Sequence, residues 1–197
     1  MQWLENVQAM PNDSTPSDDT LASRVWTELS RATREREHAW RTPVLATLGV
    51  DQSPQARTVV LRSADALRGE LRIFTDVRSP KVAELRARPQ AVLVFWSALL
   101  SWQLRVDVTM QVMDRGPDVD AAWERIARSA AASDYLGPAA PGQLMGGGQA
   151  ASAETVDAHH LAVLVGSVRA MDWLALGPHG QHQRRGITPQ GVQHLVP

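Results

Sequence analysis

Short apolar segments separated by turn residues constrain the fold of this chain most. Five of them precede residue 114, and they are predicted to be the strands Pro43–Val50, Ala56–Ser63, Leu71–Thr75, Gln90–Ser97 and Ser101–Met113. Turn-forming residues at 51–54 and 65–70 separate the first three strands, at the spacing of an antiparallel meander. The last two strands are almost continuously apolar, which is typical of strands that are buried on both faces. This part of the chain is therefore predicted to form an antiparallel sheet.

Helices and further strands are predicted around this sheet. Leu21, Val25 and Leu29 recur at helical spacing in a helix that begins near Thr20. The other predicted helices are Ser79–Arg88, Pro117–Ala132 and a short one at Ala153–His160, and the remaining predicted strands are Leu161–Leu176, Gln181–Ile187 and Gly191–Val196. Strands and helices do not alternate as they do in parallel α/β folds. The predicted fold class is therefore mainly β (α+β), an antiparallel, closed or partly closed barrel of about six to eight strands with peripheral helices.

The chain is predicted to form one domain at residues 20–197, after a flexible, polar lead-in at residues 1–19. Its length of 197 residues suits a single domain of this kind. Residues 133–151 are predicted to be a loop, and they include the glycine run Gly146–Gly148. No Gly-Lys-Ser/Thr follows this run, so it is not a nucleotide-binding P-loop. We interpret it as a surface loop, with a mobile lid as the alternative.

Composition and charge exclude several classes of function. Lys and Arg total 20 and Asp and Glu total 21, so there is no general attraction to nucleic acid or to an anionic membrane. The chain has no cysteine, which excludes disulfides and thiolate metal sites. The six histidines do not have the spacing of metal ligands, and no metal site is expected. Neither a membrane-spanning run nor a signal-peptide pattern is present, so a cytoplasmic protein with a small-molecule ligand is expected.

Four separated pieces of the sequence carry residues suited to binding an anion or a heterocycle. They are the runs Arg57–Arg62, Phe74–Lys81 and Trp102–Arg105, and Trp173 followed by His182–Arg185. Strand alternation directs Arg57 and Arg62 to opposite faces. Ser79 and Lys81 lie where a strand runs into a helix N-terminus, which is a natural phosphate site. The amide of Gln103 can both donate to and accept from a heterocycle edge. Each piece alone is more often an edge arginine, a helix cap or a buried polar residue than part of a binding site.

Together, these pieces resemble the FMN-binding core of the pyridoxamine 5′-phosphate oxidase-like split-barrel proteins. The runs that carry the resemblance are Arg-Thr-Val-Val-Leu-Arg, Leu-Arg-Ile-Phe-Thr-Asp-x-Arg-Ser-Pro-Lys-Val-x-Glu-Leu, Arg-Pro-x-Ala-x-Leu-Val-Phe-Trp and Gln-Leu-Arg-Val. They agree with the family in order and spacing over residues 42–113, and a weaker match reaches Trp173 and Arg184. The resemblance implies an antiparallel split β-barrel, FMN as the cofactor, and a homodimer with the cofactor site at its interface.

The resemblance also implies a role for individual residues. Arg57 and Lys81 would bind the FMN phosphate, with Ser79 close by. The strand after Arg57 would run along the isoalloxazine edge, and Arg62 would lie near the flavin ring. Gln103 would come from the partner subunit, and Trp173 and Arg184 would close the site across the interface. The full set is Arg57, Thr58, Val59, Val60, Leu61, Arg62, Phe74, Thr75, Ser79, Lys81, Gln103, Trp173 and Arg184.

Other parts of the chain depart from the family pattern. The Arg-Leu-His run that holds the substrate of the vitamin B6 oxidases is replaced by Gly177–Gly180, and Pro80 replaces an arginine found in many relatives. The residue types that bind the substrate phosphate occur at a different spacing, as Trp123, Arg125, Arg128, Ser129, Ser133 and Tyr135. The resemblance therefore implies FMN binding and leaves the substrate unassigned.

The function expected from these features is that of an FMN-dependent oxidoreductase. FMN would carry the redox chemistry, and Arg62 or Arg184 would stabilise the reduced flavin anion. One alternative is a flavin-binding or sensor-like module without turnover. Another is a relative that uses the deazaflavin F420 or haem. Haem would need a histidine as its axial ligand, and no histidine lies in the core motif. Turnover by a substrate distinguishes the enzyme from the binding module.

Overall fold

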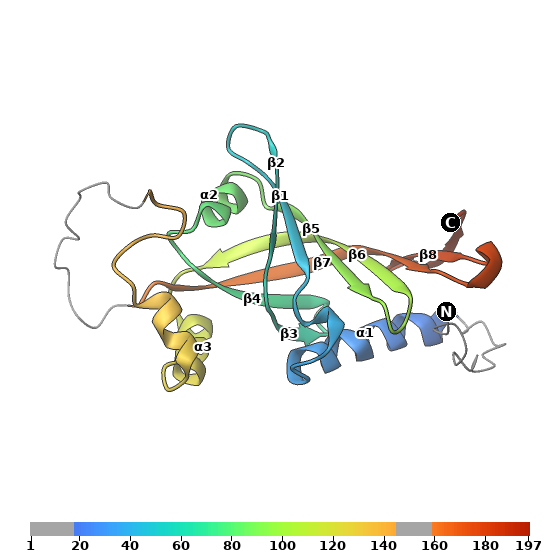
Figure 1. The fold of residues 1–197 in the computed structure, drawn as a ribbon, viewed down its shortest axis with the longest axis horizontal. Coiled ribbons are helices and arrows are strands. Elements are labelled where there is room, and N and C mark those ends of the chain that lie inside the picture. The colour runs from blue at the N-terminus through green and yellow to red at the C-terminus, as the bar shows by residue number, and fades with distance from the viewer. Residues whose placement is uncertain (1–17, 145–158) are drawn as a thin grey trace, which may run out of the picture.

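A nine-stranded antiparallel sheet organises the part of the chain that the computed structural model describes, residues 18–144 and 159–197 (Figure 1). The strand order is β2-β1-β5-β6-β7-β4-β3, and β8 pairs with both β7 and β9. The strands are β1 (Val44–Leu48), β2 (Pro54–Thr58), β3 (Leu61–Asp65), β4 (Glu70–Asp76), β5 (Gln90–Ser97), β6 (Trp102–Met113), β7 (Leu161–Ala175), β8 (Gln183–Thr188) and β9 (Gly191–Leu195). The predicted mainly β fold with peripheral helices is confirmed.

Two long strands, β6 and β7, form the spine of the sheet and pair with each other from end to end. The first half of β7 also pairs with β4, so that Leu161 lies opposite Asp76. Its second half pairs with β8 instead, so that Leu174 lies opposite Arg184. In Figure 1, the β8–β9 hairpin therefore extends from one end of the molecule, and the half of β7 that pairs with β4 lies toward the other end.

The predicted strand Ala56–Ser63 is in fact two strands, separated at Val59 and Val60. β2 pairs with β1, whereas β3 pairs with β4 across the sheet. The inward-outward alternation continues through the break, because Val59 and Leu61 are buried and Thr58 is exposed. The sequence has no turn signal here, since an apolar run favours extended backbone whichever strand it pairs with. The expected six to eight strands therefore become nine among the described residues.

Helix α1 (Asp18–Arg34) covers the sheet near β3 and the 3-10 helix η1 (Ala39–Arg41). It buries an apolar stripe at helical spacing, as predicted, with Leu21, Val25 and Leu29 at most 2% exposed. The helix begins two residues before Thr20, so the last residues of the predicted lead-in are helical. Residues 1–17 lie outside the described residues.

The other helices lie after β4 and after β6. Helix α2 (Pro80–Ala87) packs on β1 and β6, with Ser79 at its N-cap. Helix α3 (Pro117–Ile126) is shorter than predicted and is followed by the 3-10 helix η2 (Ala130–Tyr135). It ends early because Ser129 donates to the Ile126 carbonyl with both its backbone N–H and its hydroxyl, each at 2.8 Å. A third 3-10 helix, η3 (Pro178–Gly180), precedes β8.

Two predicted features lie wholly or mostly outside the described residues: the glycine run at 146–148 and the short helix at 153–160. The main core lies between the sheet and α1, and it contains Trp40, Phe95, Trp102 and Trp173. A second apolar cluster lies between α3 and the first half of β7. Within the described ranges, no helix is long and apolar enough to cross a membrane.

Candidate cofactor site

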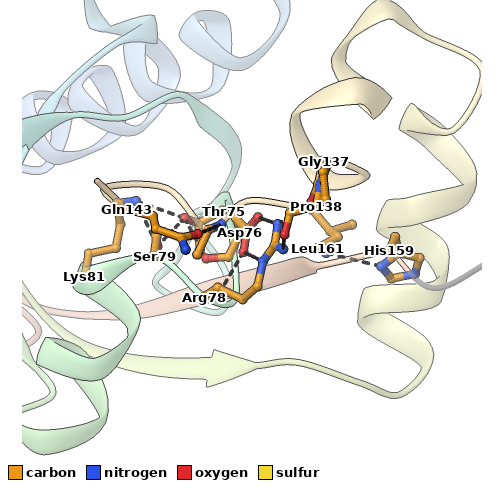
Figure 2. Close-up of polar contacts among 11 residues, drawn as sticks. Thr75, Asp76, Arg78, Ser79, Lys81, Gly137, Pro138, Gln143, His159 and Leu161 are labelled. Atoms are coloured by element: carbon orange, nitrogen blue, oxygen red, sulfur yellow. Dashed lines mark hydrogen bonds and ion pairs between the residues drawn. The ribbon is translucent and has the colours of Figure 1, made fainter. Parts of the chain in front are cut away.

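Three polar side chains converge where β4 runs into α2. The ammonium of Lys81 donates to Thr75 Oγ1 and to Ser79 Oγ, at 3.1 Å each, and the two hydroxyl oxygens are 3.2 Å apart (Figure 2). Thr75 and Ser79 are buried, and Lys81 is half-buried. We call this group, Thr75, Ser79 and Lys81, the phosphate cradle. Its donors and its position at a helix N-terminus suit a phosphate group.

The local sequence explains why these side chains meet. Pro80 starts α2, because proline lacks the N–H that a first helical turn leaves unpaired. Within the described structure, the Ser79 hydroxyl makes no capping bond to the helix and turns toward Lys81 instead. The hydroxyl can therefore donate to a ligand oxygen, and the exposed start of the helix adds a partial positive charge.

Lys81 is the single lysine of the chain, and its environment favours the binding of an anion. Burial and the neighbouring Arg57 cation lower the pKa of Lys81, while Glu84 and Asp76 partly oppose them. The charged form of Lys81 is thus under-stabilised in the protein without a ligand. An anion at the cradle would supply the missing favourable interaction.

Arg57, the second cation predicted to bind phosphate, lies beside the cradle in a buried network. Its guanidinium bonds to Glu84 Oε2 at 2.8 Å and also donates to the hydroxyl of Thr47. The Thr47 hydroxyl donates to the same Glu84 oxygen at 2.6 Å. The triangle joins β1, β2 and α2, and it uses only part of the five-donor guanidinium. Arg57 therefore has donors left for a ligand.

Thr47 and Glu84 were not identified from the sequence as site residues. Glu84 lies one helical turn after Lys81. A carboxylate at this spacing from a lysine is the sequence feature that could have identified Glu84 as a site residue. Its partner Arg57 is 27 residues earlier in the sequence, on strand β2. Sequence spacing alone does not indicate such a contact.

Replacing Glu84 with alanine is expected to destabilise the fold by about 3 kcal/mol, because it leaves the partly buried Arg57 cation and the Thr47 hydroxyl without their acceptor. Urea unfolding measures this change. The matched control is Glu124→Ala at an exposed position on α3, which is expected to cost less than about 0.5 kcal/mol. Equal stability of the two variants would contradict the network.

Arg62 lies on β3, near a second polar region. Its guanidinium carbon is 5.6 Å from the centre of the Phe74 ring, and among the described residues its buried Nε has no hydrogen-bond partner. Burial raises the pKa of the nearby Tyr135, although the Arg62 charge acts in the opposite direction. A cavity of about 240 Å³ opens beside Arg62, and its charged lining residues are Arg62, Asp65, Arg68, Arg72, Asp118 and Arg125.

The predicted residues of the C-terminal half lie elsewhere in the same chain. Gln103 and Arg184 flank Leu174 on the neighbouring strands. Arg184 forms a two-bond ion pair with Asp172, at 2.9 and 2.6 Å. Trp173 instead points into the core, where it is 3% exposed and its ring centre is 5.1 Å from that of Trp102. Gln103 and Arg184 are therefore partly exposed on the outer face, whereas Trp173 is buried on the inner one.

The length of β7 separates these residues from the phosphate cradle. The cradle adjoins Asp76, which lies opposite Leu161, whereas Gln103 and Arg184 lie opposite Leu174. Thirteen residues of a strand span about 40 Å at about 3.3 Å per residue. One chain therefore does not bring the two halves of the predicted site together.

Residues 23–114, which hold the cradle, Arg57 and Arg62, match the family model described as "Pyridoxamine 5'-phosphate oxidase, FMN-binding domain". The chain is 33% identical over 106 residues to the pyridoxine/pyridoxamine 5′-phosphate oxidase of Microcystis aeruginosa, covering 54% of this chain and 48% of that protein. It is 49% identical over 63 residues to the oxidase of Thermosynechococcus vestitus, covering 32% of this chain and 29% of that protein. The chain thus matches about half or less of the length of these relatives.

Solved structures show the same fold over most of the chain. A pyridoxamine 5′-phosphate oxidase-related, FMN-binding protein from Nostoc punctiforme has a TM-score of 0.67 and 19% identity, covering 88% of this chain and 96% of that one. PhzG from Burkholderia lata, solved with tetrahydrophenazine-1-carboxylic acid, also has a TM-score of 0.67, with 18% identity, 96% coverage of this chain and 98% of that one. Over residues 23–114 the chain thus matches the FMN-binding domain of the pyridoxamine 5′-phosphate oxidase family, and it shares the split-barrel fold of these solved structures.

Proposed function

We propose that this protein binds FMN and uses it as an oxidoreductase. The phosphate cradle is the observation that carries the proposal, because it combines an under-stabilised ammonium, two hydroxyls and a helix N-terminus. Lys81 would hold the FMN phosphate with Ser79 and Thr75, and Arg57 would reach it with the donors that Glu84 and Thr47 leave free. When bound, FMN supplies the hydride chemistry.

The other residues in this half of the site would orient the flavin. The chain between β2 and β3 follows Arg57 directly, so its backbone would run beside the ring. Arg62 has a buried nitrogen without a partner among the described residues, and its charge would favour the electron-rich form of the ring. Phe74 lies against the Arg62 guanidinium, so it would help to hold Arg62 beside the flavin.

The protein is proposed to act as a homodimer whose two chains share each site. The separation of about 40 Å along β7 supports this, because a second copy could bring Gln103 and Arg184 to a cradle that they do not adjoin in their own chain. The outer face of the sheet also presents apolar side chains beside Gln103. Val44 is 39% exposed and Trp96 is 47% exposed, and Trp96 lies directly opposite Gln103. A two-fold contact over this face would cover them.

The substrate is proposed to carry an anionic group. The cavity beside Arg62 has four arginines and two aspartates in its lining, so its charge is positive. Arg72 pairs with Asp118 at 3.2 Å and Arg68 with Asp65 at 3.8 Å, which leaves Arg62 and Arg125 to face the cavity. Such a lining favours a carboxylate or phosphate substrate next to the flavin.

Anaerobic reduction of the bound flavin tests the proposed activity. The holoprotein is mixed with pyridoxine phosphate, pyridoxamine phosphate and other small anionic amines, alcohols and cyclic amines, and the flavin absorbance is followed. Bleaching by one of them, with recovery on admitting air, is the expected result. A flavin that none of them reduces, in protein that holds FMN tightly, would instead indicate a binding module without turnover.

The pH dependence of FMN binding follows from Lys81. A bound phosphate stabilises the charged ammonium and so raises the lowered pKa of Lys81. FMN affinity is therefore expected to fall as the pH rises through the pKa of the free protein. Reductive methylation with ¹³C labels only this side chain and the α-amine, so carbon NMR can follow the titration with and without FMN. An unchanged Lys81 pKa on FMN binding would contradict the assignment.

A further inference from the structure

Arg78 ties residues 136–144 to the start of the phosphate cradle. Its guanidinium donates to the carbonyl of Gly137 at 2.9 Å and to that of Pro138 at 3.1 Å, across about 60 residues of sequence (Figure 2). We call residues 136–144 the cover segment. It follows η2 directly, and the Tyr135 carbonyl before it accepts from the His160 N–H at 2.8 Å.

Asp76 fixes the direction of the Arg78 side chain. Its carboxylate, 5% exposed, accepts from Arg78 Nε at 3.0 Å and from Nη2 at 2.6 Å. It also accepts from the backbone N–H of Arg78 at 2.8 Å. This pairing raises the pKa of Arg78. The guanidinium is thus held on one side by a buried charge and offers its remaining donors to the cover segment.

The cover segment lies against the first turn of α2. A Cβ built on Gly142 would be 3.5 Å from Pro80 Cγ, so the backbone passes in contact with the residue between Ser79 and Lys81. Figure 2 shows Gln143, the next residue, on the same side as Ser79 and Lys81. Little apolar burial holds the segment here, because Leu136 is 51% exposed and Leu144 is 87% exposed. Its place therefore depends on the polar contacts of Arg78.

We propose that Arg78 is a positioning residue of the cofactor site, which holds the cover segment over the phosphate cradle and so slows the release of a phosphate-bearing cofactor. The inference rests on the proposed FMN function for its ligand. Arg78 need not touch the phosphate, since Asp76 and the two carbonyls account for its side-chain contacts. Its effect is expected mainly on the dissociation rate, which depends on how firmly the bound state is enclosed.

The test compares Arg78→Gln with Arg86→Gln in the full chain. Arg86 lies on α2, which begins two residues after Arg78, and its hydrogen bond in the described structure goes to Asp114 at 2.7 Å, not to the cover segment. Hydrogen exchange of residues 136–144 is measured first, without FMN, and stopped-flow dissociation of FMN second. Arg78→Gln is expected to speed exchange in the cover segment and FMN release by about tenfold, and Arg78→Lys to restore part of both. Arg86→Gln is expected to change neither.

Each contrary result has a separate meaning. Faster exchange in Arg78→Gln with unchanged FMN release would overturn the proposal, because the segment would then not enclose the cofactor. Unchanged exchange would overturn it as well, since Arg78 would not hold the segment. A wild-type protein that takes up no FMN contradicts the proposed function instead, and the exchange measurement still decides whether Arg78 holds the segment.

Discussion

Lys81→Ala is expected to weaken FMN binding by about 10- to 100-fold. The variant removes the ammonium of the cradle, and a hydrogen bond to a charged group contributes about 1.5 to 3 kcal/mol, where every 1.4 kcal/mol corresponds to tenfold in affinity. Thr75 and Ser79 remain, so some affinity is retained. Fluorescence titration with FMN measures the change, because flavin emission responds to binding.

Riboflavin provides the control for this prediction, since it carries the same ring without the phosphate. Its affinity is expected to be the same for the wild type and for Lys81→Ala. Lys81→Arg keeps the positive charge, and it is expected to bind FMN better than the alanine variant. If Lys81→Ala weakens riboflavin and FMN equally, the side chain supports the fold of the site and does not bind the phosphate.

Trp96→Glu is expected to convert a dimer into folded monomers and to abolish FMN retention. The ring is 47% exposed on the outer face of β5, opposite Gln103, so a carboxylate there would be buried without a partner in a two-fold contact. Analytical ultracentrifugation and the flavin absorbance of the same sample measure both effects. Leu67→Glu is the matched control, because Leu67 is fully exposed on the β3–β4 turn. This variant is expected to leave the oligomeric state and FMN retention unchanged.

Mixing two defective chains tests the shared site more sharply. Lys81→Ala disables the cradle, and Arg184→Ala removes a residue from the opposite end of β7. In a mixed dimer, one site would carry both defects and the other would be intact, so refolding the two together is expected to restore up to one FMN per dimer. A mixture that binds no more FMN than the separate variants, although mixed dimers form, would contradict a site built from two chains.

Local pattern was enough to predict most of the fold. The apolar stripe of α1 is buried as its helical spacing predicts, because an amphipathic helix has only one face suited to the core. The prediction that β5 and β6 are buried on both faces was wrong, because buried residues alternate with half-buried or exposed ones along most of each strand. The break at Val59 and Val60 was missed, since partner exchange between strands leaves no mark in an apolar run.

The cradle was predictable because its residues lie within seven positions of one another, at a strand–helix junction. The contacts that support it were not. Glu84 on α2 reaches Arg57 on β2, and Arg78 reaches carbonyls about 60 residues away. Such pairs depend on how β2, α2 and η2 pack together, and charged residues at these positions are otherwise typical of a solvated surface. Trp173 lies in the core, and its implied role at the cofactor stays a prediction.

The central claim is that this chain binds FMN through the cradle, and the absorbance spectrum of the purified protein tests it most directly. The spectrum is recorded as isolated and again after FMN is added and the excess is removed. We expect retained flavin bands at about 370 and 450 nm in the wild type, and their loss in a folded Arg57→Ala/Lys81→Ala double variant. A folded wild type that stays colourless after incubation with FMN would contradict this claim.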